Sequence, residues 1–316
     1  MTTPSRREPQ SHTDPALSAI MSERRQLINL AYRLLGSLAE AEDAVQETYT
    51  RWYAMSRERQ EAIESPGAWL TKVAGRICLD VLGSARARRE SYVGEWIPEP
   101  LPDRAEWAAG RPGDGGGHPV DPADRVTLDE SVDMAFLVVL ESMTPAERVA
   151  FILHDVFRYP FAEVAAIVGR TPAACRQLAA SARRRIGAAP APVSRARERA
   201  VVIRDFKRAW EARDIAALVA LLDPAATMTA DGGGRVGAVL RPVVGGERIA
   251  RYIVEMAGRA PAPGLDLLER SVNGSPGLVA RYGGATVTVA AFAVADDRIT
   301  HIWVVRNPEK LRPWSA

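Results

Sequence analysis

One stretch near the middle of the chain limits how many hydrophobic cores it can build. From Pro98 to Asp124 the sequence is rich in Pro, Gly and Asp, with Gly113-Asp114-Gly115-Gly116-Gly117 near its centre. This composition is typical of a linker that separates folded units. A second break follows at Ala189-Pro190-Ala191-Pro192. The 316 residues are therefore expected to form two or three domains.

The segments between these breaks differ in hydrophobic period. Two helical blocks are predicted, from Ile20 to Glu90 and from Val126 to Ala188. The last block opens with helices and then becomes rich in Val and Ala. Its β-branched content and turn residues predict strands at Leu278 to Tyr282, Ala285 to Val294 and Ile299 to Val305, with Asp296-Asp297 as a hairpin turn. The predicted fold class is mainly α, followed by an α+β domain with helices first and an antiparallel sheet after them.

These features divide the chain into five parts. Residues 1–18 are rich in Pro, Ser, Thr and charge and are predicted to be a disordered tail. Two helical domains at 19–95 and 126–189 follow, joined by a linker at 96–125. The α+β domain spans 195–316.

Composition excludes several classes of function. The two cysteines, Cys78 and Cys175, are far apart and belong to different predicted helices, so no disulfide framework is expected. The histidines show no metal-ligand spacing, and no cofactor is expected. No apolar run approaches the ~18 residues of a spanning helix, and the polar N-terminus is unlike a secretory signal. A cytoplasmic location is the expectation.

The first block contains a helix with two different faces, from Ala39 to Ala54. At 100° per residue, one face carries Ala41, Ala44, Val45, Thr48 and Trp52. The other face carries Asp43, Gln46, Glu47 and Thr50. Spacing alone favours an acidic, solvated face on a helix packed against a core.

The next helix, from Trp69 to about Arg89, becomes basic toward its end. Its apolar stripe consists of Leu70, Val73, Ala74, Ile77 and Val81. The polar residues off this stripe are Lys72, Arg76, Asp80, Arg86, Arg88 and Arg89. Cations at a helix C-terminus oppose the helix dipole, which is a structural explanation. A basic helix end beside Trp69 also suits a nucleic-acid backbone, and Arg76 and Asp80 have the spacing of an ion pair.

The second block contains a helix-turn-helix pattern. A helix from Phe161 to Val168 is followed by Gly169 and by Thr171-Pro172, which can cap a second helix that runs to Ile186. The inward face of this helix carries Cys175, Leu178, Ala179, Ala182 and Ile186. Its outward face carries Arg176, Gln177, Ala180, Arg183 and Arg184. Arg and Gln are the side chains that read guanine and adenine in the major groove.

The two blocks together resemble the extracytoplasmic-function sigma factors of the sigma-70 superfamily. The resemblance is carried by Leu34-Leu35-Gly36, Ala41 to Thr48, Pro66 to Leu70, Arg76 to Asp80, Leu140 to Arg148 and Phe161 to Ala165. It implies core RNA polymerase and promoter DNA as partners. Polymerase would meet Asp43, Gln46, Glu47 and Thr50. The loop from Ser56 to Ser65 and the helix after it would capture a flipped base of the minus-ten element, through Trp69, Lys72, Arg76, Asp80, Arg86, Arg88 and Arg89. The minus-thirty-five element would be read by Arg170, Thr171, Arg176, Gln177, Arg183 and Arg184.

The final block resembles the SnoaL-like, nuclear-transport-factor-like fold, a cone of helices around a curved sheet. Asp205 to Trp210, Arg213-Asp214 and Leu218 to Leu222 carry this resemblance. One sigma subgroup with such an extension is matched at Trp96-Ile97-Pro98-Glu99-Pro100, Asp231-Gly232-Gly233-Gly234-Arg235 and Asn307-Pro308-Glu309-Lys310-Leu311. The resemblance implies that the extension replaces a separate anti-sigma partner. The hypothesis is that these segments contact the sigma domains and the Trp96 linker.

Two other functions stay open at this point. A helix-turn-helix regulator could sense a small-molecule ligand through its C-terminal domain, but that function leaves the acidic face and the Trp69 helix unexplained. An enzyme of the cyclase or isomerase type could use Asp231 or His301 as acid or base. Fold alone does not grant an activity, so the expectation is a protein that is not an enzyme and does not span a membrane.

Overall fold

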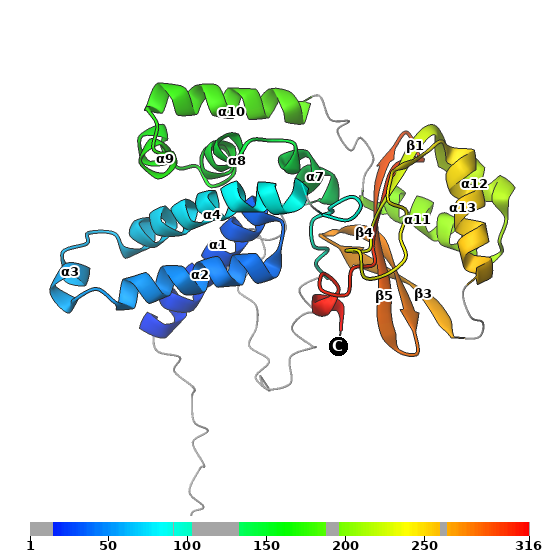
Figure 1. Ribbon diagram of the computed structural model, residues 1–316, viewed down its shortest axis with the longest axis horizontal. Coiled ribbons are helices and arrows are strands. Elements are labelled where there is room, and N and C mark those ends of the chain that lie inside the picture. The colour runs from blue at the N-terminus through cyan, green and yellow to red at the C-terminus, as the bar shows by residue number, and fades with distance from the viewer. Residues whose placement is uncertain (1–14, 91, 103–132, 188–195, 260–263, 316) are drawn as a thin grey trace, which may run out of the picture.

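The computed structural model describes residues 15–90, 92–102, 133–187, 196–259 and 264–315 (Figure 1). The first helical block consists of α1 (Pro15–Leu35), α2 (Leu38–Tyr53), α3 (Arg57–Glu61) and α4 (Pro66–Glu90). α1 begins within the stretch predicted as a tail, and residues 1–14 lie outside the described residues. None of the described helices combines the length and apolarity needed to cross a membrane.

A tight turn joins α1 to α2. Gly36 has a φ of +70°, in the left-handed region that favours glycine at the end of a helix. Ser37 then caps α2 by accepting a hydrogen bond from the backbone N–H of Glu40. This short connection lets α1, α2 and α4 pack against one another around a common core.

The second helical block consists of α7 (Met134–Glu141), α8 (Pro145–Phe151), a π-helical turn (Ile152–Val156), α9 (Phe161–Val168) and α10 (Pro172–Gly187). The predicted helix-turn-helix is present in α9 and α10. Gly169, with a φ of +70°, ends α9. The Thr171 hydroxyl accepts a hydrogen bond from Ala174 N at 3.2 Å and caps α10.

The two helical blocks share one hydrophobic core although residues 96–125 separate them in sequence. Leu34, Ala74, Leu153 and Val164 all belong to this core and are fully buried. α9 and α8 lie against α4, with α10 outside them (Figure 1). The contact is close at Gly75 of α4, because a Cβ added there would lie 3.0 Å from Ile167 Cγ2 of α9.

The C-terminal domain is α+β, as predicted. Its helices are α11 (Ala196–Glu211), α12 (Ile215–Leu221) and α13 (Gly246–Arg259). Its strands are β1 (Leu222–Asp231), β2 (Val243–Val244), β3 (Leu265–Val272), β4 (Ser275–Tyr282), β5 (Ala285–Ala295) and β6 (Arg298–Val305). A short 3-10 helix at Arg312–Trp314 follows.

The sheet differs from the prediction in topology. Its order is β2-β1-β6-β5-β4-β3, and β1 pairs with β6 in parallel, so the sheet is mixed rather than antiparallel. α13 also lies between strands in sequence, so the helices do not all come first. A parallel pair needs a long crossover, which here contains β2, α13, β3, β4 and β5. The predicted turn at Asp296-Asp297 joins β5 to β6, and both residues have a positive φ.

The two faces of the sheet have different neighbours. One face packs against α11, α12 and α13 and buries Phe206, Met228, Ile249 and Phe292. The other face buries residues from elsewhere in the chain, among them Ile97 of the linker, Met134 of α7 and Trp314 of the C-terminal tail. The described part of the linker and the tail run between the helical blocks and the sheet (Figure 1). The C-terminal domain is therefore packed against the rest of the protein.

Candidate functional site

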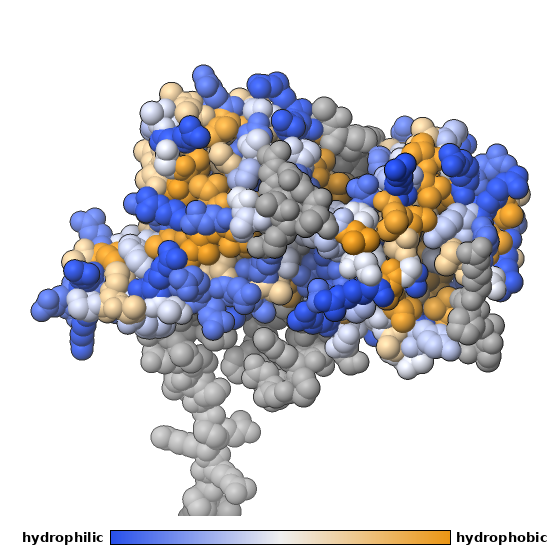
Figure 2. All heavy atoms as spheres, viewed as in Figure 1, coloured by the Kyte–Doolittle hydropathy of each residue, from blue (hydrophilic) through white to orange (hydrophobic). Residues whose placement is uncertain are grey.

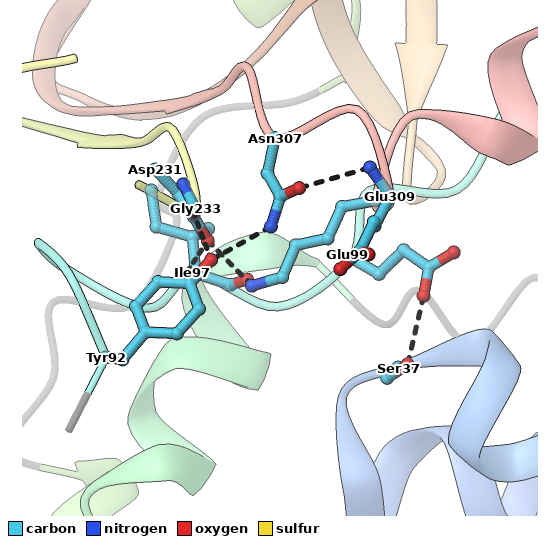
Figure 3. Close-up of polar contacts among 9 residues, drawn as sticks. Ser37, Tyr92, Ile97, Glu99, Asp231, Gly233, Asn307 and Glu309 are labelled. Atoms are coloured by element: carbon cyan, nitrogen blue, oxygen red, sulfur yellow. Dashed lines mark hydrogen bonds and ion pairs between the residues drawn. The ribbon is translucent and has the colours of Figure 1, made fainter. Parts of the chain in front are cut away.

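The carboxylate of Asp231, at the end of β1, is fully buried and surrounded by donors (Figure 3). Its Oδ1 accepts from Tyr92 Oη at 2.6 Å and from Gly233 N at 3.0 Å. Its Oδ2 accepts from Ile97 N at 3.1 Å and from Lys310 Nζ at 2.6 Å. Burying a carboxylate is costly unless it is paired and hydrogen-bonded, so these donors allow an aspartate at this position.

Lys310 connects three segments of the chain. Besides Asp231, its ammonium donates to the carbonyl of Ile97. It also lies 4.0 Å from the centre of the Trp96 ring and 5.4 Å from the centre of the Tyr92 ring. A cation over an aromatic face is attracted by the ring quadrupole, most strongly where water is excluded. We call Tyr92, Trp96, Asp231, Asn307 and Lys310 the Asp231 cluster.

Tyr92 and Asn307 complete this cluster. Burial, followed by the hydrogen bond to Asp231, raises the pKa of Tyr92 above its usual range, so the phenol stays protonated and donates. Asn307 Nδ2 donates to Tyr92 Oη at 2.9 Å, and Asn307 Oδ1 accepts from Glu309 N at 3.1 Å. Each member of the cluster therefore orients another.

The glycine turn after β1 is needed for this packing. Gly233 has a φ of +63°, and a Cβ there would lie 2.5 Å from Asn307 Nδ2. Gly234 also has a positive φ, and its added Cβ would lie 3.1 Å from Val93 Cβ. Only glycine gives the left-handed backbone and the close approach together.

The structure brings the three predicted regulatory segments together. Trp96, Asp231, Asn307 and Lys310 belong to the Asp231 cluster, and Gly233 N donates to Asp231. At its surface, Arg235 pairs with Glu309 at 2.7 Å, with both side chains about half exposed. Gly232 and Leu311 are buried, whereas Pro308 is exposed.

A second contact joins the C-terminal domain to the first helical block, and sequence reasoning missed it. Asn273, in the β3–β4 turn, donates to Tyr32 Oη at 2.8 Å and accepts from Leu101 N at 3.0 Å. Tyr32 in turn donates to the carbonyl of Glu99 at 2.6 Å. The sequence offers only the Asn273-Gly274 turn as a local indication, since the two partners are 241 residues apart.

The linker also caps the N-terminus of α2. Glu99 Oε2 accepts from Leu38 N at 2.8 Å and from Ser37 Oγ at 3.2 Å. Glu99 is buried, and burial raises its pKa although these hydrogen bonds oppose the shift. The residues from Trp96 to Pro102, predicted as part of a linker, therefore pack tightly, and residues 103–125 lie outside the described residues.

The second helical block has its own polar contacts with its neighbours. Arg199 of α11 pairs with Asp133, the N-cap of α7, at 3.5 Å. Arg148 of α8 is almost fully buried and donates to the carbonyl of Leu34 at 2.9 Å and to Glu141 at 2.7 Å. Burial lowers the pKa of Arg148 to about 10, which leaves it protonated.

The predicted polymerase-binding face of α2 is accessible. Asp43, Gln46, Glu47 and Thr50 are exposed, whereas Ala41, Ala44, Val45 and Thr48 are buried, as the periodicity predicts. Glu47 pairs with Arg51 at 2.9 Å, and both side chains are about half exposed. Hydrophilic residues also cover the tip formed by α3 (Figure 2).

The second helical block covers part of α4, the predicted minus-ten helix. Arg76 Nη2 donates to the carbonyl of Ala166 in α9 at 2.7 Å, and among the described residues no ion pair joins it to Asp80. Thr71 accepts from Tyr159 Oη at 2.9 Å. Trp69 packs edge-on against Trp52 with ring centres 5.2 Å apart. Lys72 and Asp80 are exposed. The side chains of Arg86, Arg88 and Arg89 lie outside the described residues.

The predicted DNA-reading face of α10 is open. Arg170, Thr171, Arg176, Gln177, Arg183 and Arg184 are all exposed, and Cys175 faces the core. Figure 2 shows hydrophilic side chains along the outer edge that α10 forms. Two of these arginines already have partners within the protein. Arg176 lies over the Phe161 ring, and Arg183 pairs with Asp155.

The two residues considered for acid–base chemistry are not brought together. In the register of β1 and β6, Asp231 pairs with Val305, four residues from His301. The carboxylate of Asp231 is held by the cluster, and burial lowers the pKa of His301. In the described ranges, no three His, Cys, Asp or Glu side chains gather as a metal site.

Comparison with known proteins identifies the two helical blocks. The family model of Sigma-70 region 2 matches residues 19–89, and that of Sigma-70, region 4 matches residues 133–186. The ECF RNA polymerase sigma factor SigJ of Mycobacterium tuberculosis is 37% identical over 298 residues, covering 91% of this chain and 90% of that protein. The probable ECF RNA polymerase sigma factor SigI of the same organism is 37% identical over 308 residues, covering 97% and 98%.

The likeness extends to the C-terminal domain. The crystal structure of the extracytoplasmic function sigma factor SigJ from M. tuberculosis superposes with a TM-score of 0.72 at 32% identity. The match covers 94% of this chain and 98% of that one. It therefore spans both helical blocks and the α+β domain.

Proposed function

The chain belongs to the extracytoplasmic-function RNA polymerase sigma factors, and on that premise we propose that its C-terminal domain regulates it from within the same chain. As a sigma factor it binds core RNA polymerase and directs promoter-specific initiation. The first helical block is region 2 and the second is region 4. In our proposal the Asp231 cluster holds the linker between these regions against the C-terminal domain.

The assignment of surfaces follows from exposure and charge. We assign Asp43, Gln46, Glu47 and Thr50 of α2 to core polymerase. Minus-ten DNA is assigned to Trp69, Lys72, Arg76, Asp80, Arg86, Arg88 and Arg89. Minus-thirty-five DNA is assigned to α10 and the turn before it, whose exposed Arg and Gln side chains suit base edges and phosphates.

The observation that carries the regulatory proposal is the position of Lys310. Its ammonium contacts Asp231 of the C-terminal domain together with Trp96 and Ile97 of the linker. A residue of the C-terminal tail thereby fixes the linker that must span the gap between regions 2 and 4. The Asn273 contact with Tyr32 supports the same arrangement from region 2.

The expected sign of this regulation is inhibition. In the described arrangement Arg76 of the minus-ten helix is bound by region 4, and Gly75 lies against Ile167. DNA and region 4 cannot contact this part of α4 at the same time. Activity therefore requires region 4 to move away from α4, and the Asp231 cluster opposes that movement.

We propose that the chain catalyses no covalent reaction, because Asp231 is committed to its structural partners and lies four register positions from His301. A sigma factor acts where polymerase and the chromosome are, so a cytoplasmic location follows.

The test is transcription in vitro with purified core polymerase and the full chain, on a pool of genomic promoters. Lys310→Met removes the ammonium and keeps a side chain of similar length. We expect promoter-dependent transcripts from the wild type and several times more from Lys310→Met. Lys207→Met, at the half-buried lysine of α11, serves as the matched control and should match the wild type.

Each outcome bears on a separate part of the proposal. No promoter-dependent transcripts from any variant, despite binding to DNA, would contradict the sigma function and favour a ligand-sensing regulator. Equal amounts of promoter-dependent transcript from the wild type and from Lys310→Met would contradict regulation by the Asp231 cluster. Turnover of a small molecule that depends on Asp231 or His301 would favour an enzyme.

A further inference from the structure

Arg176 and Arg183 lie seven residues apart on α10, so they project from one face of the helix. Arg183 contacts the π-helical turn from Ile152 to Val156 directly through Asp155, whereas Arg176 lies over Phe161 of α9, whose ring stacks on His154 of the same turn. The exposed residues beside them, Gln177 and Arg184, have no side-chain hydrogen bond or ion pair among the described residues. On this face of α10, Arg176 and Arg183 are therefore held by the protein, whereas the side chains of Gln177 and Arg184 are not held by any part of the chain that the structure describes.

Asp155 holds Arg183 with two hydrogen bonds. Arg183 Nε donates to Asp155 Oδ1 at 2.7 Å, and Arg183 Nη2 donates to Asp155 Oδ2 at 3.2 Å. A guanidinium has five N–H donors in one plane. This geometry uses the side edge of the plane and leaves the end edge, formed by Nη1 and Nη2, free for two parallel bonds. The Arg183 side chain is 47% exposed, so this edge can be reached by DNA.

His154, the preceding residue, supports Arg176 through Phe161. The His154 ring stacks on the Phe161 ring with centres 3.7 Å apart and planes 25° from parallel. Its Nδ1 lies 2.8 Å from the carbonyl of Tyr159, and since a carbonyl only accepts, Nδ1 carries the proton. The guanidinium of Arg176 lies 5.6 Å from the centre of the same Phe161 ring. This contact favours one orientation of Arg176.

The π-helical turn brings these two supports to one place. Phe157 N donates to the carbonyl of Ile152, five residues back, at 3.1 Å, which widens the turn. Residues 154 and 155 thereby reach α9 and α10 respectively. Single π-turns of this kind are frequent at functional sites.

We propose that Asp155 and His154 are positioning residues for promoter reading, Asp155 acting directly on Arg183 and His154 acting on Arg176 through Phe161. This inference rests on the proposed binding of α10 to minus-thirty-five DNA. An arginine whose guanidinium is already held in one orientation loses less rotamer freedom when its Nη1 and Nη2 form two bonds to the O6 and N7 of guanine. The base pairs read by Arg183 are therefore specified through Asp155.

The experiment is a selection of minus-thirty-five sequences from a random library by the full chain bound to core polymerase. The variants are Asp155→Asn, Arg183→Ala and the two combined. Glu163→Gln, at an exposed carboxylate of α9, controls for the loss of one negative charge. Thermal unfolding of each variant separates loss of preference from loss of fold.

We expect Asp155→Asn to relax the same base-pair positions as Arg183→Ala, by about fivefold or more. In the Arg183→Ala background Asp155→Asn should have no further effect on preference. Asp155→Glu, which restores a carboxylate, should recover part of the preference. Phe161→Leu should relax a different position, the one that Arg176→Ala relaxes.

Two results would overturn the proposal. Asp155→Asn could strengthen binding equally for all sequences, as removal of a charge near phosphates would. It could also lower thermal stability while leaving base preference intact. Failure of the wild type to select any sequence would instead contradict the proposed DNA binding of α10, so the two failures are distinguishable.

Discussion

Lys310 and Asp231, which are 79 residues apart in sequence, form an ion pair of 2.6 Å with side chains only 10% and 0% exposed. Around this pair the chain gathers the start of the linker and the turn after β1. A buried pair of this kind is strongly destabilising when one partner is lost, because the other charge stays behind without compensation. The pair therefore favours an all-or-none change between the docked C-terminal domain and the released one.

Removing the ammonium should destabilise the docked C-terminal domain. We predict that Lys310→Met lowers the free energy of unfolding by about 3–5 kcal/mol, because Asp231 is left buried without its cation. Adding Asp231→Asn to Lys310→Met should restore part of this loss. Denaturant unfolding measures both. Equal stability of Lys310→Met and the control Lys207→Met would contradict the prediction.

Asn273 joins two domains and also has a φ of +52°. Asn273→Ala should cost about 2–3 kcal/mol, because it removes one hydrogen bond to region 2 and one to the linker and leaves a strained backbone. Asn273→Gly loses the same hydrogen bonds without the strain and should cost about 1 kcal/mol less. Chemical unfolding of both variants separates the two contributions. If Asn273→Gly is as stable as the wild type, the contact with Tyr32 is not stabilising.

Two glycines of α4 offer a matched test of the contact between regions 2 and 4. A Cβ at Gly75 would lie 3.0 Å from Ile167, whereas a Cβ at Gly83 would meet no atom within 4 Å. Both substitutions to Val change helix propensity alike. We predict that Gly75→Val is less stable than Gly83→Val by about 1–3 kcal/mol through overpacking. Equal melting temperatures would show that α9 does not press on α4 in solution.

Glu99 should make stability depend on pH. Burial raises its pKa above the ordinary value of 4.5, so the folded state holds the proton more tightly than the unfolded state. The contribution of protonated Glu99 to the free energy of unfolding is present below pH 4.5 and is lost as the pH rises through the pKa of Glu99 in the folded state. We predict that Glu99→Gln reduces the fall in unfolding free energy above pH 4.5, and that Glu64→Gln, at an exposed glutamate, does not. An unchanged pH profile in Glu99→Gln would contradict this assignment.

Local chemistry explains which parts of the fold the sequence could predict. Thr171, Pro172 and the buried spacing of Cys175, Ala179 and Ala182 define α10 within a few residues, so its position and open face follow from periodicity. α13 carries the same kind of evidence in its buried Ile249 and Ile253, and could have been predicted. β1 could not be predicted, because Asp223-Pro224 near its start is typical of a turn. Its parallel partner β6 also lies some 75 residues later in the sequence.

The candidate site likewise has a part that the sequence could predict and a part that it could not. The resemblance to one sigma subgroup indicated Trp96, Asp231 and Lys310, and the structure places them together. Tyr32 and Asn273 have no such indication, since their contact exists only when three segments meet in space. The engagement of Arg76 with region 4 was also missed, because Asp80 on the same helix offered a nearer partner than Ala166.

We propose that the Asp231 cluster holds regions 2 and 4 together. The most direct measurement is the distance between fluorophores on Glu58→Cys in α3 and Gly187→Cys at the end of α10, both exposed. The native Cys78 and Cys175 are buried and should not label. We predict a single narrow distribution of distances in the otherwise wild-type chain and a broader distribution when Lys310→Met is added. The same distribution in both proteins would contradict the claim.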